Sequence, residues 1–155
     1  AIGQADVVVL GPGSLYTSIL PNLLIPGFVE ALRSTSALRI YVCNVMTQPG
    51  ETDGYTASDH VHALLRHTGW PPPFDYVLVN EALISAGQAE KYAQEGAYPV
   101  EADLPALEEL GLKVHSADLL DQNHLVRHAS AKLAEEIIRL AEEHEKLKLP
   151  GVRAS

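Results

Sequence analysis

A run of apolar residues that stops at a glycine-rich turn, close to the start of the chain, most constrains the fold. Residues 6–10 (Asp-Val-Val-Val-Leu) are followed directly by Gly-Pro-Gly-Ser at residues 11–14, and a helical pattern follows that turn. Continuous β-branched runs are typical of parallel strands covered on both faces. A buried parallel strand that leads through a tight loop into a helix builds an anion site, because loop amides and the helix dipole favour negative charge. The segment therefore predicts both an α/β fold and a site for an anionic ligand.

Apolar strands and amphipathic helices alternate along the rest of the chain. After the first strand, the expected strands are residues 38–43, 75–79 and 113–116, and the expected helices are residues 28–34, 58–67, 86–94, 104–110 and 130–147. Gly111 is a suitable C-cap for the helix that precedes it. This alternation predicts a Rossmann-like α/β fold, a three-layer sandwich with a mostly parallel sheet.

The last predicted helix has the clearest pattern. Its apolar stripe consists of Leu133, Ile137, Leu140 and Leu147, with His144 at the remaining position of the same face. Glutamates occupy the opposite side, as expected for a helix with one face in water. A Pro-Gly pair at residues 150–151 is expected to end this helix.

Composition and charge exclude several classes of protein. The formal net charge of −9, without a basic stripe, argues against a nucleic-acid partner. No apolar run reaches the ~18 residues that a membrane span needs, and the start of the chain lacks the basic and apolar regions of a signal peptide. The single cysteine, Cys43, excludes a disulfide framework and is expected to be an inert core thiol. We therefore expect a cytoplasmic protein without a membrane partner.

The turn after the first strand supplies the first group of candidate ligand-binding residues. Gly11 and Gly13 permit a close approach of the backbone to a ligand, and ligands of open parallel sheets bind beyond the carboxyl ends of the strands. The full group is Gly11, Pro12, Gly13, Ser14, Tyr16 and Thr17. The local pattern supports equally well a tight strand-to-helix turn that binds nothing.

A long polar segment, residues 44–60, follows the second strand and is expected to open at the same edge of the sheet. Long loops in compact domains are usually either functional or disordered. The candidates for lining a site are Asn44, Thr47, Gln48, Glu51 and Thr52. Farther along, Asp53 and Gly54 form a turn signal, and Ser58 is the expected N-cap of the next helix.

Two more polar residues fall near the predicted edge. Asn80 ends the third strand, where its amide could contact a base or ribose, or could cap its own backbone. Arg127, next to His128, could contact an anion or pack within a loop. The histidines of residues 60–67 lack the i, i+4 spacing of a helical metal site. We find no Ser-His-Asp order, cysteine nucleophile or paired carboxylate that predicts catalysis.

These segments together resemble the YvcK-type gluconeogenesis factor family, a branch of the CofD-like superfamily. The resemblance rests on Gly-Pro-Gly-Ser-Leu-Tyr-Thr-Ser at residues 11–18 and Met-Thr-Gln-Pro-Gly-Glu-Thr at residues 46–52. Asp-His at residues 59–60 and Val-Arg-His at residues 126–128 extend it. The similarity runs in order along nearly the whole chain.

The resemblance implies that the chain is an incomplete half of a larger domain. Family members are about twice as long and begin with a Gly-Gly-Gly-Thr-Gly phosphate loop, and this chain has no such loop and no initiator Met. We therefore expect residues 1–155 to be the carboxyl-terminal part of a single CofD-like α/β domain. Alone, it should expose apolar surface, bind nucleotides weakly or not at all, and tend to self-associate. The expected partner is either a second copy of the chain in a homo-oligomer or the missing amino-terminal half. Ala129 stands where the family has an acidic residue, so Ser130 is the expected cap of the last helix.

The function that the resemblance implies is regulatory. Such a protein binds a nucleotide-sugar of the UDP-N-acetylglucosamine type and acts in gluconeogenic growth, cell shape and wall synthesis, without an established reaction. The alternative is an Mg²⁺-dependent transferase of the 2-phospho-L-lactate type, with Glu51 and Asp53 helping to hold the metal against phosphates. A third alternative is a structural module with an empty cleft. Apart from Mg²⁺ in the transferase alternative, no cofactor is expected.

Overall fold

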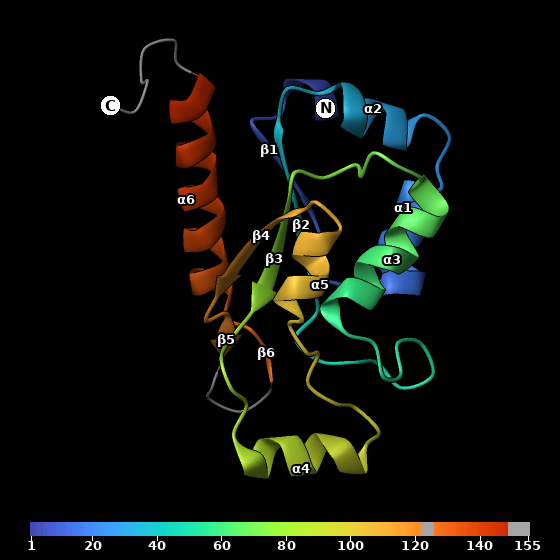
Figure 1. Ribbon diagram of the computed structural model, residues 1–155, viewed down its shortest axis with the longest axis vertical. Coiled ribbons are helices and arrows are strands. Elements are labelled where there is room, and N and C mark those ends of the chain that lie inside the picture. The colour runs from blue at the N-terminus through green and yellow to red at the C-terminus, as the bar shows by residue number, and fades with distance from the viewer. Residues whose placement is uncertain (122–125, 149–155) are drawn as a thin grey trace.

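Four parallel strands form the central sheet. In the computed structural model, which describes residues 1–121 and 126–148, they are β1 (Val7–Leu10), β2 (Leu38–Val42), β3 (Tyr76–Asn80) and β4 (Lys113–Ala117). The strands lie side by side in sequence order. Because all of them run in the same direction, their carboxyl ends meet at one edge, which is the lower edge of the sheet in Figure 1.

One face of the sheet is covered by the helices that connect the strands. After a 3-10 turn at Ile2–Gln4, these are a π-helical turn at Leu15–Ile19, α1 (Leu20–Leu23), α2 (Phe28–Ser34), α3 (Ala57–Thr68) and α5 (Leu104–Glu109). Figure 1 shows them to the right of the sheet and in front of it. Tyr41 and Val77 of the sheet pack here with Leu32, Leu64 and Leu107 of the helices. This larger of the two main cores holds the connecting helices in place.

The opposite face is covered by one long helix. α6 (Ser130–Lys148) lies along the sheet at the left of Figure 1. Its Leu133 and Leu140 pack against Ile40 and Leu78 of the sheet. Helices on both faces of a parallel sheet confirm the predicted Rossmann-like, three-layer α/β fold.

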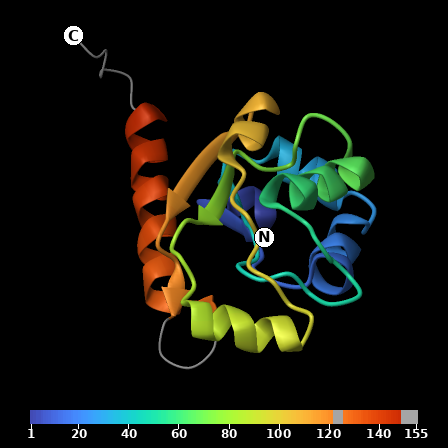
Figure 2. The same ribbon diagram turned by 60° about the horizontal axis from the view of Figure 1, so that its bottom comes forward.

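Smaller elements lie beyond the carboxyl edge. α4 (Ala86–Gln94) belongs to the segment between β3 and α5, and β5 (Leu120–Asp121) pairs antiparallel with β6 (Arg127–His128) ahead of α6. Figure 2 turns this edge forward, with α4 at the front. The Tyr92 hydroxyl of α4 accepts a 2.9 Å hydrogen bond from the Val126 amide. The α4 segment is thereby joined to the β5–β6 pair.

β1 is less buried than its sequence predicts. We expected both faces to be covered, but Leu10 is its only buried residue, and Val9 is 39% exposed. β1 is an edge strand, and Val9 packs into neither of the two main buried clusters of the described residues. The expectation was wrong for this strand because an apolar run does not reveal which strand lies at the edge.

The start of α3 also differs from the prediction. The cap is Thr56, whose hydroxyl accepts a hydrogen bond from the Asp59 amide at 3.3 Å, while the Asp59 carboxylate accepts one from the Thr56 amide at 3.0 Å. Ser58 lies inside the first turn and donates its amide and hydroxyl to the Asp103 carboxylate. Ser58 is therefore not the N-cap, because the backbone is already helical at Ala57.

At both ends of α6 the structure also differs from the prediction. Leu147 was predicted to belong to the apolar stripe, but it is 77% exposed. The last turn of α6 lies beyond the start of the sheet, and Lys148 in that turn donates a hydrogen bond to the carbonyl of Ser36, ahead of β2. At the other end, the Leu133 amide donates to the carbonyl of Ala129. Ser130 is thus already inside the helix rather than at its cap. The predicted terminator at residues 150–151 lies outside the described residues.

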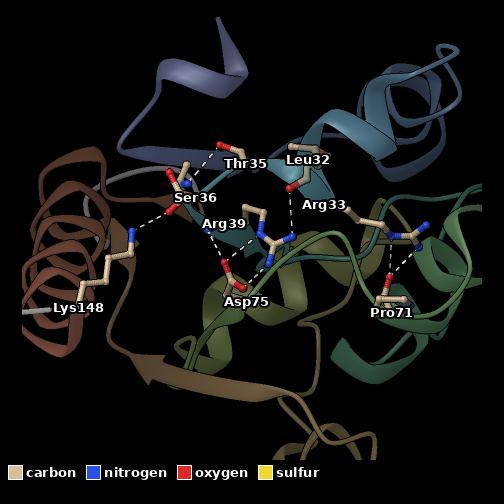
Figure 3. Close-up of polar contacts among 9 residues, drawn as sticks. Leu32, Arg33, Thr35, Ser36, Arg39, Pro71, Asp75 and Lys148 are labelled. Atoms are coloured by element: carbon tan, nitrogen blue, oxygen red, sulfur yellow. Dashed lines mark hydrogen bonds and ion pairs between the residues drawn. The ribbon is translucent and has the colours of Figure 1, made fainter. Parts of the chain in front are cut away.

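Polar contacts tie the elements together at the amino edge of the sheet. The Arg39 guanidinium contacts both carboxylate oxygens of Asp75, with Nε–Oδ2 at 3.0 Å and Nη2–Oδ1 at 2.5 Å, and the Arg39 amide also donates to Oδ2. Figure 3 shows this pair beside Arg33, which donates to the carbonyl of Pro71. Burial raises the pKa of Asp75, but hydrogen bonds from Arg39 outweigh burial and hold that pKa below its ordinary value. The pair connects β2 to the start of β3.

Within the described residues, no single helix has both the length and the apolar character to cross a membrane. One sharply bent pair of segments, Leu15–Leu23 and Phe28–Ser34, meets the criterion by length and composition.

Replacing Asp75 with Asn should lower the free energy of unfolding by about 2 kcal/mol at pH 7, because Arg39 loses its charged partner at a half-buried position. Since the folded pKa of Asp75 is lowered, this contribution is complete above the ordinary carboxylate pKa of about 3.9 and is lost as pH falls through the lower folded value. Urea unfolding at pH 7 and pH 3 measures both effects. Glu142→Gln, at an exposed site on α6, is the control. An undiminished difference between Asp75→Asn and the wild type at low pH would contradict the assignment.

Leu140→Ala should lower the free energy of unfolding by about 3 kcal/mol, because it leaves a cavity between α6 and the sheet. Leu147→Ala, the same substitution two turns later, should change it by less than about 0.5 kcal/mol, because that side chain is in water. Thermal and urea unfolding of the two variants provide the measurement. Equal losses would show that the end of α6 is packed rather than exposed.

Candidate functional site

The turn after β1 requires glycine at its first position. Gly11 has φ +87°, and a Cβ atom there would lie 2.8 Å from the carbonyl oxygen of Val42. The absence of a side chain therefore lets the turn approach the end of β2 closely. Gly13 has a negative φ and ordinary space around it, so it carries no such requirement. The first loop is thus held against the start of the second.

Asn44 fastens the two loops together. Its Oδ1 accepts the Gly13 amide at 3.3 Å, and its Nδ2 donates to the Gly13 carbonyl at 3.0 Å. Both groups of the side-chain amide are used, and each retains capacity for one more hydrogen bond. Asn44 therefore positions the first loop and can still contact a ligand.

A second contact between the loops passes through Ser14. Its hydroxyl donates to Glu51 Oε2 at 2.5 Å and accepts from the Thr17 amide and hydroxyl at 3.2 and 2.5 Å. One donor and two acceptor positions are all that a serine hydroxyl has. Ser14 is therefore fully engaged, and a ligand would have to displace one of these partners to bond with it.

The rest of the second loop is held by its own polar groups. The Thr52 side chain is fully buried, and its hydroxyl accepts the Gln48 amide at 2.8 Å. The Thr47 hydroxyl accepts the Tyr98 amide at 2.9 Å, and the Thr47 amide donates to the Tyr98 carbonyl at 2.7 Å. Thr47 thus binds the loop to the chain that returns from α4. These contacts give the second loop a defined shape.

A hollow of about 240 Å³ lies between these segments at the carboxyl edge of the sheet. We call it the carboxyl-edge hollow; it is lined by Gly13, Ser14, Asn44, Val45, Met46, Thr47, Gln48, Val126, Arg127 and His128. The structure thus brings together six of the predicted ligand residues, from segments that are far apart in the sequence. His128 was noted beside Arg127 in the sequence but not chosen as a site residue, and the available signals were its adjacency to Arg127 and its place in the Val-Arg-His block of the family resemblance.

The remaining candidates lie outside the lining of the carboxyl-edge hollow. Gly11 and Pro12 line a separate depression of about 280 Å³ along β1, together with Phe28. The Tyr16 hydroxyl bonds to that of Tyr55 at 2.8 Å. Glu51 and Thr17 do not line the hollow but contact its lining residue Ser14, and Glu51 and Thr52 both bond to the lining residue Gln48.

Asn80 lies on the other side of the same edge. Its Oδ1 accepts the Leu119 amide at 3.0 Å, and its Nδ2 donates to the Ala82 carbonyl at 2.9 Å. It also lines a largely apolar depression of about 410 Å³ with Ile84, Val100 and other residues. Val45 lines both this depression and the carboxyl-edge hollow, so the two are adjacent.

The charged and titratable groups around the hollow are few. Arg127 is exposed at the rim, where its Nε lies 3.3 Å from Asp121 Oδ2. Burial lowers the pKa of His128, while the contact with the Cys43 carbonyl opposes that effect. Burial raises the pKa of the Cys43 thiol to about 12, so this thiol is a protonated core group. In the described part of the chain, no cluster of His, Cys, Asp and Glu is arranged to hold a metal ion. As far as the described residues show, the hollow therefore offers hydrogen bonds and the guanidinium of Arg127 at its rim.

Comparison with known proteins places this arrangement in a family. The family described as 2-phospho-L-lactate transferase CofD matches residues 1–120. A gluconeogenesis factor from Halalkalibacterium halodurans is 49% identical over 139 residues, which are 89% of this chain and 43% of that protein. A gluconeogenesis factor from Bacillus subtilis is 45% identical over 143 residues, 92% of this chain and 45% of that protein.

A solved structure agrees with these sequence relatives. The crystal structure of a protein from Bacillus halodurans superposes with a TM-score of 0.84 at 48% identity, and the match covers 88% of this chain and 44% of that one. The chain thus spans less than half the length of the relatives it matches. It belongs to the CofD family, on the branch whose curated members are gluconeogenesis factors.

Proposed function

We propose that the chain contributes one wall of a nucleotide-sugar site in a cytoplasmic regulatory protein of the gluconeogenesis factor type. The observation that carries the proposal is the pair of polar loops locked together at the carboxyl edge by Asn44 and Ser14. In open parallel sheets, this edge is where ligands bind. The ligand would be of the UDP-N-acetylglucosamine type. Its binding would signal the state of carbon supply, and the protein would pass this signal to the processes that control cell shape and wall synthesis.

The two adjacent depressions suit a ligand with chemically different parts. The carboxyl-edge hollow presents amide and hydroxyl groups, with Arg127 at its rim. The neighbouring depression is lined largely by apolar side chains such as Ile84 and Val100. A nucleotide-sugar combines polar sugar and phosphate groups with a flat base, and mixed pockets with a few placed polar groups are typical for such ligands.

We also propose that the site is completed by polypeptide outside this chain. The chain covers 43–45% of two of its relatives. β1 is an edge strand with Val9 partly exposed, and a depression runs along it beside Gly11 and Pro12. The rest of the family fold, or a second copy of the chain, would cover this side and supply further phosphate contacts.

Asn44→Ala should weaken the binding of UDP-N-acetylglucosamine to the intact protein by about tenfold or more, because the first loop loses both hydrogen bonds that position it. Ser14→Ala should have a similar effect, because it frees Glu51 and Thr17 from the loop. Isothermal titration calorimetry measures the affinities. Ser34→Ala, at an exposed serine of α2, is the matched control. Unchanged affinity in both site variants would contradict the assignment of the hollow.

A transferase is the second candidate function. The family match itself carries that description, and the Glu51 carboxylate lies 2.5 Å from Ser14 at the border of the hollow. A carboxylate beside a phosphate site is the usual setting for Mg²⁺, which binds phosphates through one or two carboxylates.

The transferase alternative predicts Mg²⁺-dependent release of a nucleoside mono- or diphosphate from nucleotide-linked donors. Glu51→Gln should reduce this release more than tenfold, because it removes the charge that would hold the metal, while Glu108→Gln on the exposed side of α5 should not. Chromatography of the released nucleotide is the measurement. No release from any donor of a broad panel would reject this alternative and leave the binding function.

A further inference from the structure

One ring nitrogen of His128 has a fixed role. Nε2 lies 3.1 Å from the carbonyl oxygen of Cys43, at the end of β2. A carbonyl oxygen can only accept a hydrogen bond, so Nε2 must carry the proton. In a neutral imidazole the other nitrogen, Nδ1, then has no proton and presents a lone pair. The backbone of β2 thereby selects the tautomer.

The other ring nitrogen is available. Over residues 1–121 and 126–148, Nδ1 of His128 has no hydrogen-bond partner and is not among the buried, unpartnered polar atoms. His128 is half-buried and is one of the residues that line the carboxyl-edge hollow, together with Gly13 and Asn44. Burial lowers the pKa of His128, although the hydrogen bond to Cys43 acts in the opposite direction, and this favours a neutral ring at pH 7.

We propose that Nδ1 of His128 is a hydrogen-bond acceptor that selects an O–H or N–H donor on the uncharged part of the ligand. This inference rests on the proposed function and adds an orientation to it. The oxygens of a diphosphate linkage carry no hydrogen at pH 7, so they would face the Nδ1 lone pair without a bond. The phosphates would therefore lie away from His128, toward the Gly11–Gly13 side or the Arg127 rim.

The donor can come from two parts of a nucleotide-sugar. A hydroxyl or the acetamido N–H of the sugar offers one source, and the uracil N–H or a ribose hydroxyl offers the other. UDP-N-acetylglucosamine, UDP and P1,P2-dimethyl diphosphate separate these sources, because UDP lacks the sugar and the dimethyl diphosphate lacks both the sugar and the nucleoside. The dimethyl ester carries no O–H at pH 7, whereas inorganic pyrophosphate still does. A sugar donor affects only the first ligand, whereas a nucleoside donor affects the first two.

The decisive variant is His128→Gln in the intact protein. The Gln side-chain amide can still donate to the Cys43 carbonyl from nearly the position of Nε2, but it lacks an acceptor at the position of Nδ1. Calorimetry should show about a fivefold loss of affinity for UDP-N-acetylglucosamine, the size of one net hydrogen bond, and no loss for P1,P2-dimethyl diphosphate. His67→Gln, at an exposed histidine near the end of α3, should change neither affinity.

A second measurement needs no ligand and no variant. In long-range ¹H–¹⁵N spectra of the wild-type protein at pH 7.5, His128 should show a protonated Nε2 and an unprotonated Nδ1. A protonated Nδ1, or equal affinities of the wild type and His128→Gln for UDP-N-acetylglucosamine, would overturn the inference. A loss that extends equally to P1,P2-dimethyl diphosphate would overturn the orientation. If the wild type binds no nucleotide-sugar, the proposed function fails, while the ring spectra still decide the state of Nδ1.

Discussion

The parallel pairing of β1 with β2 is the constraint on which the candidate site depends. The register aligns Leu10 with Tyr41, so the turn after β1 and the loop after β2 begin at the same edge of the sheet. Gly11 then permits contact with the Val42 carbonyl, and Asn44 closes the pair of loops through Gly13. An antiparallel pairing would place the two loops at opposite ends, and no side-chain chemistry could join them.

The contacts that build the site also limit what a ligand can use. Ser14 has all of its hydrogen-bonding positions filled, and Thr47 uses its hydroxyl to hold the segment that returns from α4. Among the described lining residues, the groups with remaining capacity include Asn44, the unpartnered Oε1 of Gln48, Arg127 at the rim and Nδ1 of His128. The polar residues that the sequence predicted as ligand contacts therefore fall into two groups. Some hold the loops in shape, and others face the hollow.

The sequence predicted helices and strands well in segments where a single hydrophobic periodicity, that of a helix or that of a strand, dominates. α2 and α4 have the predicted bounds, β2 ends one residue earlier than predicted, and β3 is shifted by one residue at both ends. Predictions failed where two local explanations compete. Ser58 and Thr56 are both suitable caps, and only the extended backbone at Thr56 decides between them. The β5–β6 pair was missed because strands of two residues show no periodic pattern.

By itself, the sequence determined the α/β class, the two polar loops and the family, because periodicity and loop motifs are local properties of the chain. Only the tertiary structure decided that Val9 lies on an edge strand, that Leu147 extends beyond the sheet, and that His128 borders the same hollow as Asn44. These outcomes depend on which surfaces meet across large separations in sequence. The glycine turn after β1 needs the carbonyl of Val42 and the side chain of Asn44 to acquire its shape.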